Sequence, residues 1–99
     1  MEEPKVTRRV IKQAQQGDPT AISMLYQAHV GIIYRYIAYR VGPEADIEDL
    51  TSEVFVRMVE SLSSYKITGA PFEAWLYRIA AARVADYHRK RKRRPQTAL

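Results

Sequence analysis

Between Ile47 and Leu62 the chain reads IEDLTSEVFVRMVESL, and the folding pattern is clearest in this stretch. Its apolar side chains recur at steps of three and four residues, which is the periodicity of an α-helix with one buried face. The apolar stripe consists of Ile47, Leu50, Val54, Met58 and Leu62, with Phe55 alongside. Acidic and polar residues occupy the opposite side. The stretch therefore predicts an amphipathic helix that begins between Glu44 and Asp46.

Upstream, two more segments have helical periodicity. The first covers about residues 6–16, carries Val6, Val10 and Ala14 on one side, and stops at Gly17. The second starts with Asp18-Pro19, an N-cap followed by a proline in the first turn, and ends near Val41 before Gly42-Pro43. Its apolar positions are Ile22, Leu25, Tyr26, His29, Ile32, Ile33, Tyr36 and Ile37. Both segments are therefore predicted to bury one face.

Downstream, residues 61–69 contain Ser63-Ser64, Thr68 and Gly69 and predict a loop. A long helix follows from about Pro71 to Arg94, where the next proline ends it. Its apolar stripe consists of Phe72, Leu76, Ala80 and Val84, flanked by Trp75, Ile79 and Tyr87. Four amphipathic helices with short connections predict an all-α fold, a compact bundle of four helices.

Composition bounds the function. Ninety-nine residues make one domain, and the absence of cysteine excludes disulfides, thiolate metal sites and cysteine nucleophiles. No signal peptide or membrane-length apolar stretch is present, so we expect a cytoplasmic protein without a membrane partner. His29 and His88 lie on different predicted helices, and the acidic residues 46–53 lack the glycine of a calcium loop. We therefore expect no catalytic residue, no metal, no cofactor and no enzymatic activity.

Charge is distributed unevenly along the chain. The run from Arg89 to Arg94 holds six of the 16 basic residues, and without it ten basic residues face 11 acidic ones, a net of −1. Between Glu44 and Glu60 there are six acidic residues and one basic residue, Arg57. Poles of opposite sign indicate two partners of opposite sign.

The basic pole lies next to aromatic residues. Tyr65, Lys66, Phe72, Trp75 and Tyr77 precede Arg78, Arg83 and the basic run. Rings of this kind stack on unpaired bases while cations follow the phosphates. Composition alone does not separate this interpretation from a packed core with a solvated basic end.

Two strings separate them. ADIEDLTSEVF at 45–55 and FEAWLYRIA at 72–80 resemble region 2 of bacterial RNA polymerase sigma factors of the extracytoplasmic-function (ECF) group. Typical strings of that group read A-D-A-E-D-L-x-Q-E-V-F and F-x-x-W-L-Y-R-I-A-x-N. Residues 17–21, GDPTA, resemble the G-D-x-x-A that precedes the family's second helix. The resemblance covers about residues 6–94, so we expect a sigma region 2 domain over 1–94 and the start of a linker or disordered tail over 95–99.

The resemblance implies two partners. The third helix of the family docks on the clamp helices of the polymerase β′ subunit, and the matching positions are Glu48, Asp49, Ser52, Glu53, Val56 and Val59. The loop and fourth helix of the family melt the promoter's minus-ten element, capture a flipped base and hold the non-template strand. The matching positions are Tyr65, Lys66, Phe72, Trp75, Arg78, Ala82 and Arg83, and the basic run adds Arg89, Lys90, Arg91 and Arg93 as candidates for phosphate contacts. An anti-sigma factor is a further partner common in the family. Phe72 and Trp75 are expected to support the base pocket from below.

The chain departs from the family pattern at two positions. Ala82 stands where the family usually has asparagine, so a hydrogen bond to the strand is lost there. Ser52 replaces the common glutamine on the docking helix and reaches less far. The second helical domain of family members does not follow within these residues, so we expect an excised domain of a longer factor or a stand-alone version. Two alternatives stay open: a nonspecific nucleic-acid-binding module dependent on the basic run, and a polymerase-binding regulator without promoter recognition.

Overall fold

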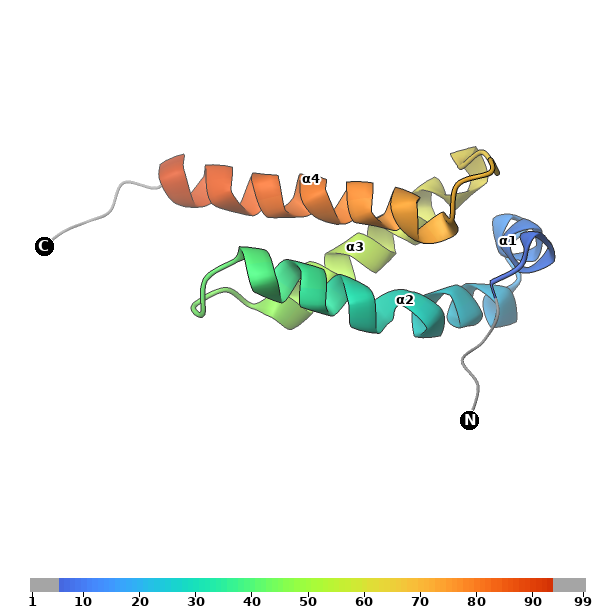
Figure 1. The fold of residues 1–99 in the computed structure, drawn as a ribbon, viewed down its shortest axis with the longest axis horizontal. Helices are drawn as coiled ribbons and strands as arrows, with labels where there is room; N and C mark the ends of the chain where they lie inside the picture. Colours follow the sequence, from blue (N-terminus) through green and yellow to red (C-terminus); the bar gives the residue numbers. More distant parts are fainter. Residues whose placement is uncertain (1–5, 94–99) are drawn as a thin grey trace, which may run out of the picture.

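A computed structural model describes residues 6–93. Its helices are α1 (Arg8–Gln15), α2 (Pro19–Arg40), α3 (Ile47–Ser61) and α4 (Phe72–Arg93), with a 3-10 turn, η1 (Leu62–Ser64), after α3. In Figure 1, α2 and α4 lie side by side and run in the same direction, α3 crosses behind them in the opposite direction, and α1 lies across one end. The all-α, four-helix architecture predicted from the sequence is confirmed.

The α1–α2 corner follows the predicted signals. The side chain of Asp18 accepts hydrogen bonds from the backbone N–H groups of Thr20 and Ala21, at 2.9 and 3.4 Å, and Pro19 is the first residue of α2. Gly17 has a φ of 90°, in the left-handed region that favours glycine at a helix end. A side chain at position 17 would meet no atom within 4 Å, so the constraint on Gly17 lies in the backbone alone.

Replacing Gly17 with alanine should therefore lower the free energy of unfolding by about 1–2 kcal/mol, the cost of left-handed backbone for a residue with a Cβ. Chemical denaturation monitored by circular dichroism would measure it. Gly69→Ala is the matched control, because Gly69 also has open space around it but no positive φ. Equal destabilisation by the two variants would contradict this account of the corner.

The start of α3 differs from the prediction. Residues 42–45 form a turn, closed by the backbone N–H of Ala45 donating to the carbonyl of Gly42 at 3.1 Å. Asp46 then caps the helix by accepting from the N–H of Asp49 at 3.0 Å. The first helical residue is thus Ile47, because the carboxylate of Asp46 serves as cap and lies outside the helix.

The core lies where the four helices meet. Its largest fully buried side chains are Leu25, Ile33, Ile37, Val54, Met58 and Leu76. The sequence pattern omitted Ile11, Ala21 and Thr51, which are also buried. Conversely, Tyr26 fell on the predicted stripe of α2 but is 44% exposed, with its ring edge against Phe55 at a centroid distance of 5.0 Å. No helix within residues 6–93 is both long enough and apolar enough to cross a membrane.

Candidate functional site

The exposed side of α3 carries the six residues predicted to bind polymerase. Glu48, Asp49, Ser52, Glu53, Val56 and Val59 are all exposed. The opposite side of the helix buries Thr51, Val54, Phe55 and Met58 in the core. Val56 and Val59 are apolar, yet they lie outside the core and are 56% and 48% exposed. The face therefore presents carboxylates together with a small apolar area.

A shallow apolar hollow continues this face onto α2. It encloses about 400 Å³ and is lined by Tyr26, Ser52, Phe55, Val56, Val59 and Glu60. Tyr26 contributes the side chain from α2, although the sequence pattern assigned it to the core. The sequence pattern could not predict that Tyr26 is exposed, because the 3.6-residue period does not distinguish residues at the edge of an apolar stripe from those at its centre. We call the six predicted α3 residues and Tyr26 the α3 face.

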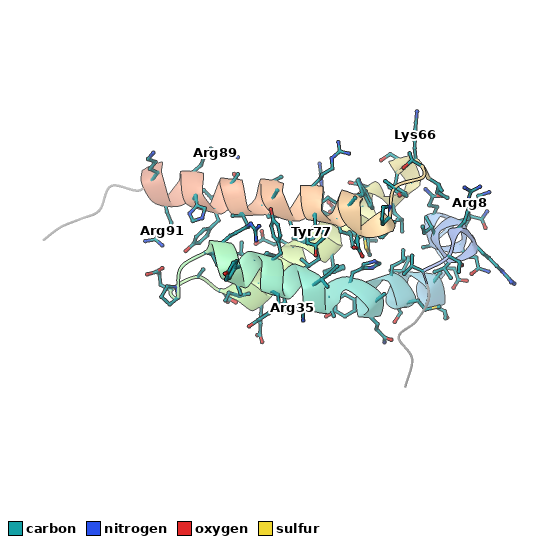
Figure 2. All side chains as sticks on the ribbon, viewed as in Figure 1. Arg8, Arg35, Lys66, Tyr77, Arg89 and Arg91 are labelled. Atoms are coloured by element: carbon teal, nitrogen blue, oxygen red, sulfur yellow. The ribbon has the colours of Figure 1, made fainter. Side chains whose placement is uncertain are left out.

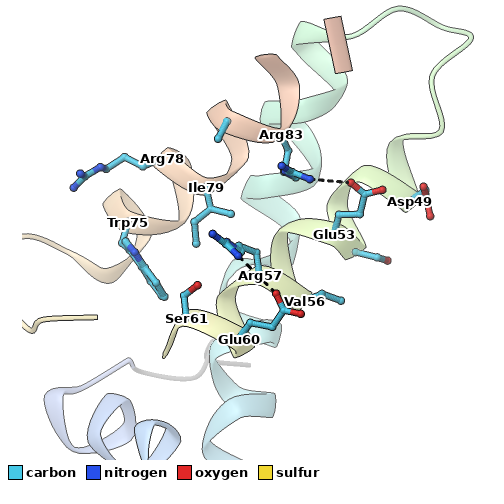
Figure 3. A pocket seen from close by; sticks show the side chains of 12 residues that line it. Asp49, Glu53, Val56, Arg57, Glu60, Ser61, Trp75, Arg78, Ile79 and Arg83 are labelled. Atoms are coloured by element: carbon cyan, nitrogen blue, oxygen red, sulfur yellow. Dashed lines mark ion pairs between the residues drawn. The ribbon is translucent and has the colours of Figure 1, made fainter. Parts of the chain in front are cut away.

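On the other side of Val56, a larger groove of about 820 Å³ separates α3 from α4 (Figure 3). Residues predicted to bind polymerase line one wall, namely Asp49, Ser52, Glu53 and Val56. Residues predicted to bind DNA line the other wall, namely Trp75, Arg78, Ala82 and Arg83. The two predicted surfaces thus share one groove. Arg57, Glu60, Ser61 and Ile79 complete it and had not been predicted.

An ion pair crosses this groove. The guanidinium of Arg83 lies 3.7 Å from the Glu53 carboxylate on α3 (Figure 3). It also lies 3.8 Å from the Asp86 carboxylate on its own helix. Asp86 also contacts Arg89 at 3.2 Å and Lys90 at 3.4 Å. Partial desolvation raises the pKa of the Asp86 carboxyl, but Lys90, Arg89 and Arg83 outweigh this and hold it below its ordinary value. Three of the predicted phosphate-binding cations therefore share the Asp86 carboxylate.

Lys66 and Arg78 differ from these three cations in their surroundings. Both side chains are exposed, and neither takes part in an ion pair within residues 6–93. Arg78 extends away from the Glu53–Arg83 pair in Figure 3, and Lys66 points outward from the loop at one end of the bundle in Figure 2. These two cations are available to an anionic partner without breaking an existing pair.

Three aromatic rings connect the loop after η1 to the start of α4. Tyr65 lies against Phe72 and Trp75 at centroid distances of 5.1 and 4.7 Å, and Phe72 and Trp75 are 5.4 Å apart. Phe72 is only 4% exposed, so it supports the loop from below and does not present a ring to solvent. Gln15 anchors the same loop from α1, because its side-chain amide donates to the carbonyls of Leu62 and Tyr65 at 3.1 and 2.7 Å.

Behind these rings lies a pocket of about 310 Å³ between α1, the loop and the start of α4. Of the residues predicted to form or support a base pocket, Tyr65 and Phe72 line it, whereas Lys66 and Trp75 do not. Other lining residues were not predicted, among them Arg8, His29, Ile67, Thr68 and Glu73. They come from segments far apart in sequence, and no spacing rule connects them. We call this cavity the loop pocket.

At the far end of α4, the basic run is bonded to the α2–α3 turn. Arg91 lies 3.0 Å from the Glu44 carboxylate and 3.4 Å from the Tyr87 hydroxyl, and these two contacts raise the pKa of its guanidinium. His88 Nε2 lies 2.8 Å from the carbonyl of Arg40 at the end of α2. Figure 2 shows Arg89 and Arg91 at this end. The side chain of Arg93 and the predicted linker at 95–99 lie outside the described part of the chain.

Comparison with known proteins identifies the fold. The family described as Sigma-70 region 2 matches residues 25–94. An NMR structure of an engineered region 2 of sigmaE in complex with GTAAAA has a TM-score of 0.81 and 27% identity, covering 97% of this chain and 99% of that one. The chain belongs to the sigma-70 region 2 family, as the sequence strings predicted, and hence to the transcription initiation factors and not to the enzymes.

The chain is also similar to curated sigma factors of the ECF group. The ECF RNA polymerase sigma factor BldN of Streptomyces coelicolor is 42% identical over 78 residues, which cover 79% of this chain and 30% of BldN. SigW of Bacillus subtilis, also an ECF sigma factor, is 32% identical over 85 residues, covering 86% of this chain and 45% of SigW. The chain is thus an ECF-type region 2 and spans less than half the length of these relatives.

Proposed function

We propose that this domain docks on the β′ clamp helices of RNA polymerase through the α3 face, and holds the non-template strand of the promoter's minus-ten element along the loop and α4. One observation carries this proposal: a single groove has the carboxylates of α3 on one wall and the cations and Trp75 of α4 on the other. A domain built in this way brings polymerase and single-stranded DNA to adjacent surfaces without nucleotide hydrolysis.

The α3 face suits a basic helical partner. Glu48, Asp49 and Glu53 supply negative charge, and Val56, Val59 and Tyr26 supply a small apolar contact beside it. Charge complementarity of this kind directs the encounter, while the apolar area is dehydrated on contact. An inhibitory anti-sigma factor that covered the same face would compete with the clamp for it.

The loop and α4 suit a separated strand. Lys66 and Arg78 form no ion pair with any of residues 6–93 and lie near an aromatic cluster, and the loop pocket is a cavity that we expect one unstacked base to enter. The solved relative was determined with GTAAAA bound, which supports a single-stranded ligand for this chain too. We further propose that the domain acts in the cytoplasm.

Fluorescence anisotropy with labelled single strands tests the DNA half. Non-template strands that carry the minus-ten element should bind more tightly than strands of scrambled sequence at equal ionic strength. Since phosphate contacts contribute equally to both, only base contacts can produce the difference. Equal affinity would reduce the interaction to nonspecific electrostatics and contradict the proposal.

Among the cations, Arg78 should matter more than Arg83. Arg78→Gln is expected to weaken strand binding roughly fivefold, whereas Arg83→Gln should weaken it about twofold or less, because Arg83 is already engaged by Glu53 and Asp86. Arg78→Gln should also reduce the slope of log affinity against log salt by about 0.7, the value for one phosphate on a single strand. Arg35→Gln, the same change at an exposed position on α2, is the control.

Truncation separates the proposal from its alternatives. Removing residues 89–99 should weaken DNA binding but leave clamp binding intact, since the α3 face is untouched. Loss of all affinity for every partner would favour a nonspecific module that depends on the basic run. Clamp binding with no preference for promoter strands would favour a regulator without promoter recognition, for which the alanine at position 82 is the relevant departure from the family.

A further inference from the structure

A buried histidine lines the loop pocket. His29 lies on α2 and is 5% exposed, and its ring is tilted against that of Phe72 at a centroid distance of 5.5 Å. Its Nδ1 atom lies 2.8 Å from the carbonyl oxygen of Leu25, one turn earlier in the helix. The sequence pattern accounts for His29 as a core residue, and the proposed contacts of the loop and α4 do not use it.

The hydrogen bond to Leu25 determines the chemistry of the other ring nitrogen. A carbonyl oxygen can only accept, so Nδ1 carries the proton, and in the neutral ring Nε2 is then a bare acceptor. None of the hydrogen bonds that join residues 6–93 involves Nε2, yet no fully buried side-chain nitrogen or oxygen in that range is left without a partner. Nε2 is therefore not sealed in the core, and the cavity that His29 lines is the loop pocket.

Other polar groups of the pocket are placed differently. Thr68 Oγ1 already accepts from the N–H of Ala70 at 3.1 Å. Arg8 is exposed at the start of α1 and is a donor only, and Glu73 is an exposed acceptor in the first turn of α4. His29 thus supplies a buried acceptor, whereas Glu73 supplies an acceptor that remains in contact with water.

We propose that His29 Nε2 accepts a hydrogen bond from the captured base and makes the loop pocket select a base with an exocyclic amino group, namely adenine, cytosine or guanine, over thymine, which has none. This inference rests on the proposed function, because it assumes that the pocket receives an unstacked base. An amine that enters the pocket donates to Nε2 and so replaces the hydrogen bond that it loses from water. A base that presents only a carbonyl there cannot donate, so both its carbonyl oxygen and Nε2 are left without a hydrogen bond. His29 would then be a specificity-determining residue supplied by α2, outside the loop and α4.

The experiment uses the full chain and labelled hexamers based on GTAAAA. An abasic nucleotide placed at each position in turn locates the captured base, as the position of greatest loss. At that position, all four bases are compared, and so are adenine and purine, which differ only in the amino group. The wild-type chain should bind each of the three amino-bearing bases more tightly than thymine there, and loss of the amine should weaken binding about three- to tenfold, the effect of one hydrogen bond.

Variants assign the effect to His29. In His29→Phe, which keeps a ring of similar size, adenine and purine should bind within about twofold of each other, whereas His29→Gln should restore part of the discrimination through its carbonyl oxygen. Glu73→Gln should leave the discrimination unchanged. Thermal unfolding checks that each variant is folded, and the wild-type comparison of adenine with purine holds without any variant.

Three outcomes would overturn the inference. They are tightest binding of thymine at the captured position, no loss on removing the amine in the wild type, and equal discrimination in the wild type and His29→Phe. Each of these can occur while promoter strands are still preferred, which leaves the proposed function standing. Equal binding of every hexamer would instead overturn the proposed function, and this inference with it.

Discussion

Reversing Asp49 and Glu53 together to lysine should weaken binding to isolated β′ clamp helices by at least about 100-fold. Both carboxylates are exposed on the α3 face, and the double variant replaces them with two ammonium groups that would face the cations of a basic partner. Like charges brought together at an interface cost several kcal/mol, which corresponds to this loss of affinity. Titration calorimetry or co-purification with the polymerase core would measure it.

A matched pair of variants separates local charge from net charge. One double variant neutralises the two carboxylates, Asp49→Asn with Glu53→Gln. The other adds two cations at exposed positions of α2, Ser23→Lys with Gln27→Lys, and each double variant changes the net charge by two units. The first pair should lose roughly tenfold in clamp affinity and the second less than threefold, because screening limits distant charges. Undiminished binding of the double lysine variant would disprove the docking face.

Leu76→Ala should lower the free energy of unfolding by about 2–5 kcal/mol, the cost of removing a large side chain from a packed core. Leu76 is fully buried on α4, in the segment that carries the aromatic cluster and Arg78. For a domain of this size the melting temperature should fall by roughly 10–25 °C. Differential scanning calorimetry measures the fall directly.

The same substitution at a half-buried site is the control for this prediction. Leu50→Ala on α3 removes identical atoms from a position that solvent partly reaches, so its cost should be about 1 kcal/mol. If Leu76→Ala were no more destabilising than Leu50→Ala, the core would not be centred where these helices meet. Strand binding by Leu76→Ala well below its melting temperature should remain close to wild type.

The sequence predicted the architecture because its local signals agree. Asp18 and Pro19 start α2, Gly17 ends the preceding helix, and each helix carries one apolar stripe. The errors occurred where a cap and a first turn contain the same residue types. Asp46 was counted among the residues that open α3, yet only the hydrogen bond to Asp49 shows which carboxylate is the cap.

The site was predictable only in part. Motif strings located the exposed carboxylates of α3 and the unpaired Arg78, because each lies within a continuous segment. They did not reveal that Arg83 pairs with Glu53, which depends on the crossing of two helices. Nor did they place Tyr26 beside Val59, or His29 in the loop pocket, since both come from α2 and join the site through packing alone.

The uninterrupted length of α4 fixes the spacing within the proposed complex. Its 22 residues correspond to a rod of about 33 Å, the rise of roughly ten nucleotide steps along one strand. The loop pocket lies at one end of this rod and the cations after Tyr87 at the other. A single residue inserted midway would turn the far end by about 100° around the helix axis while the pocket stayed in place. In the proposed complex, the helix would therefore set both the distance and the rotational phase between the captured base and the phosphates that contact the cations after Tyr87.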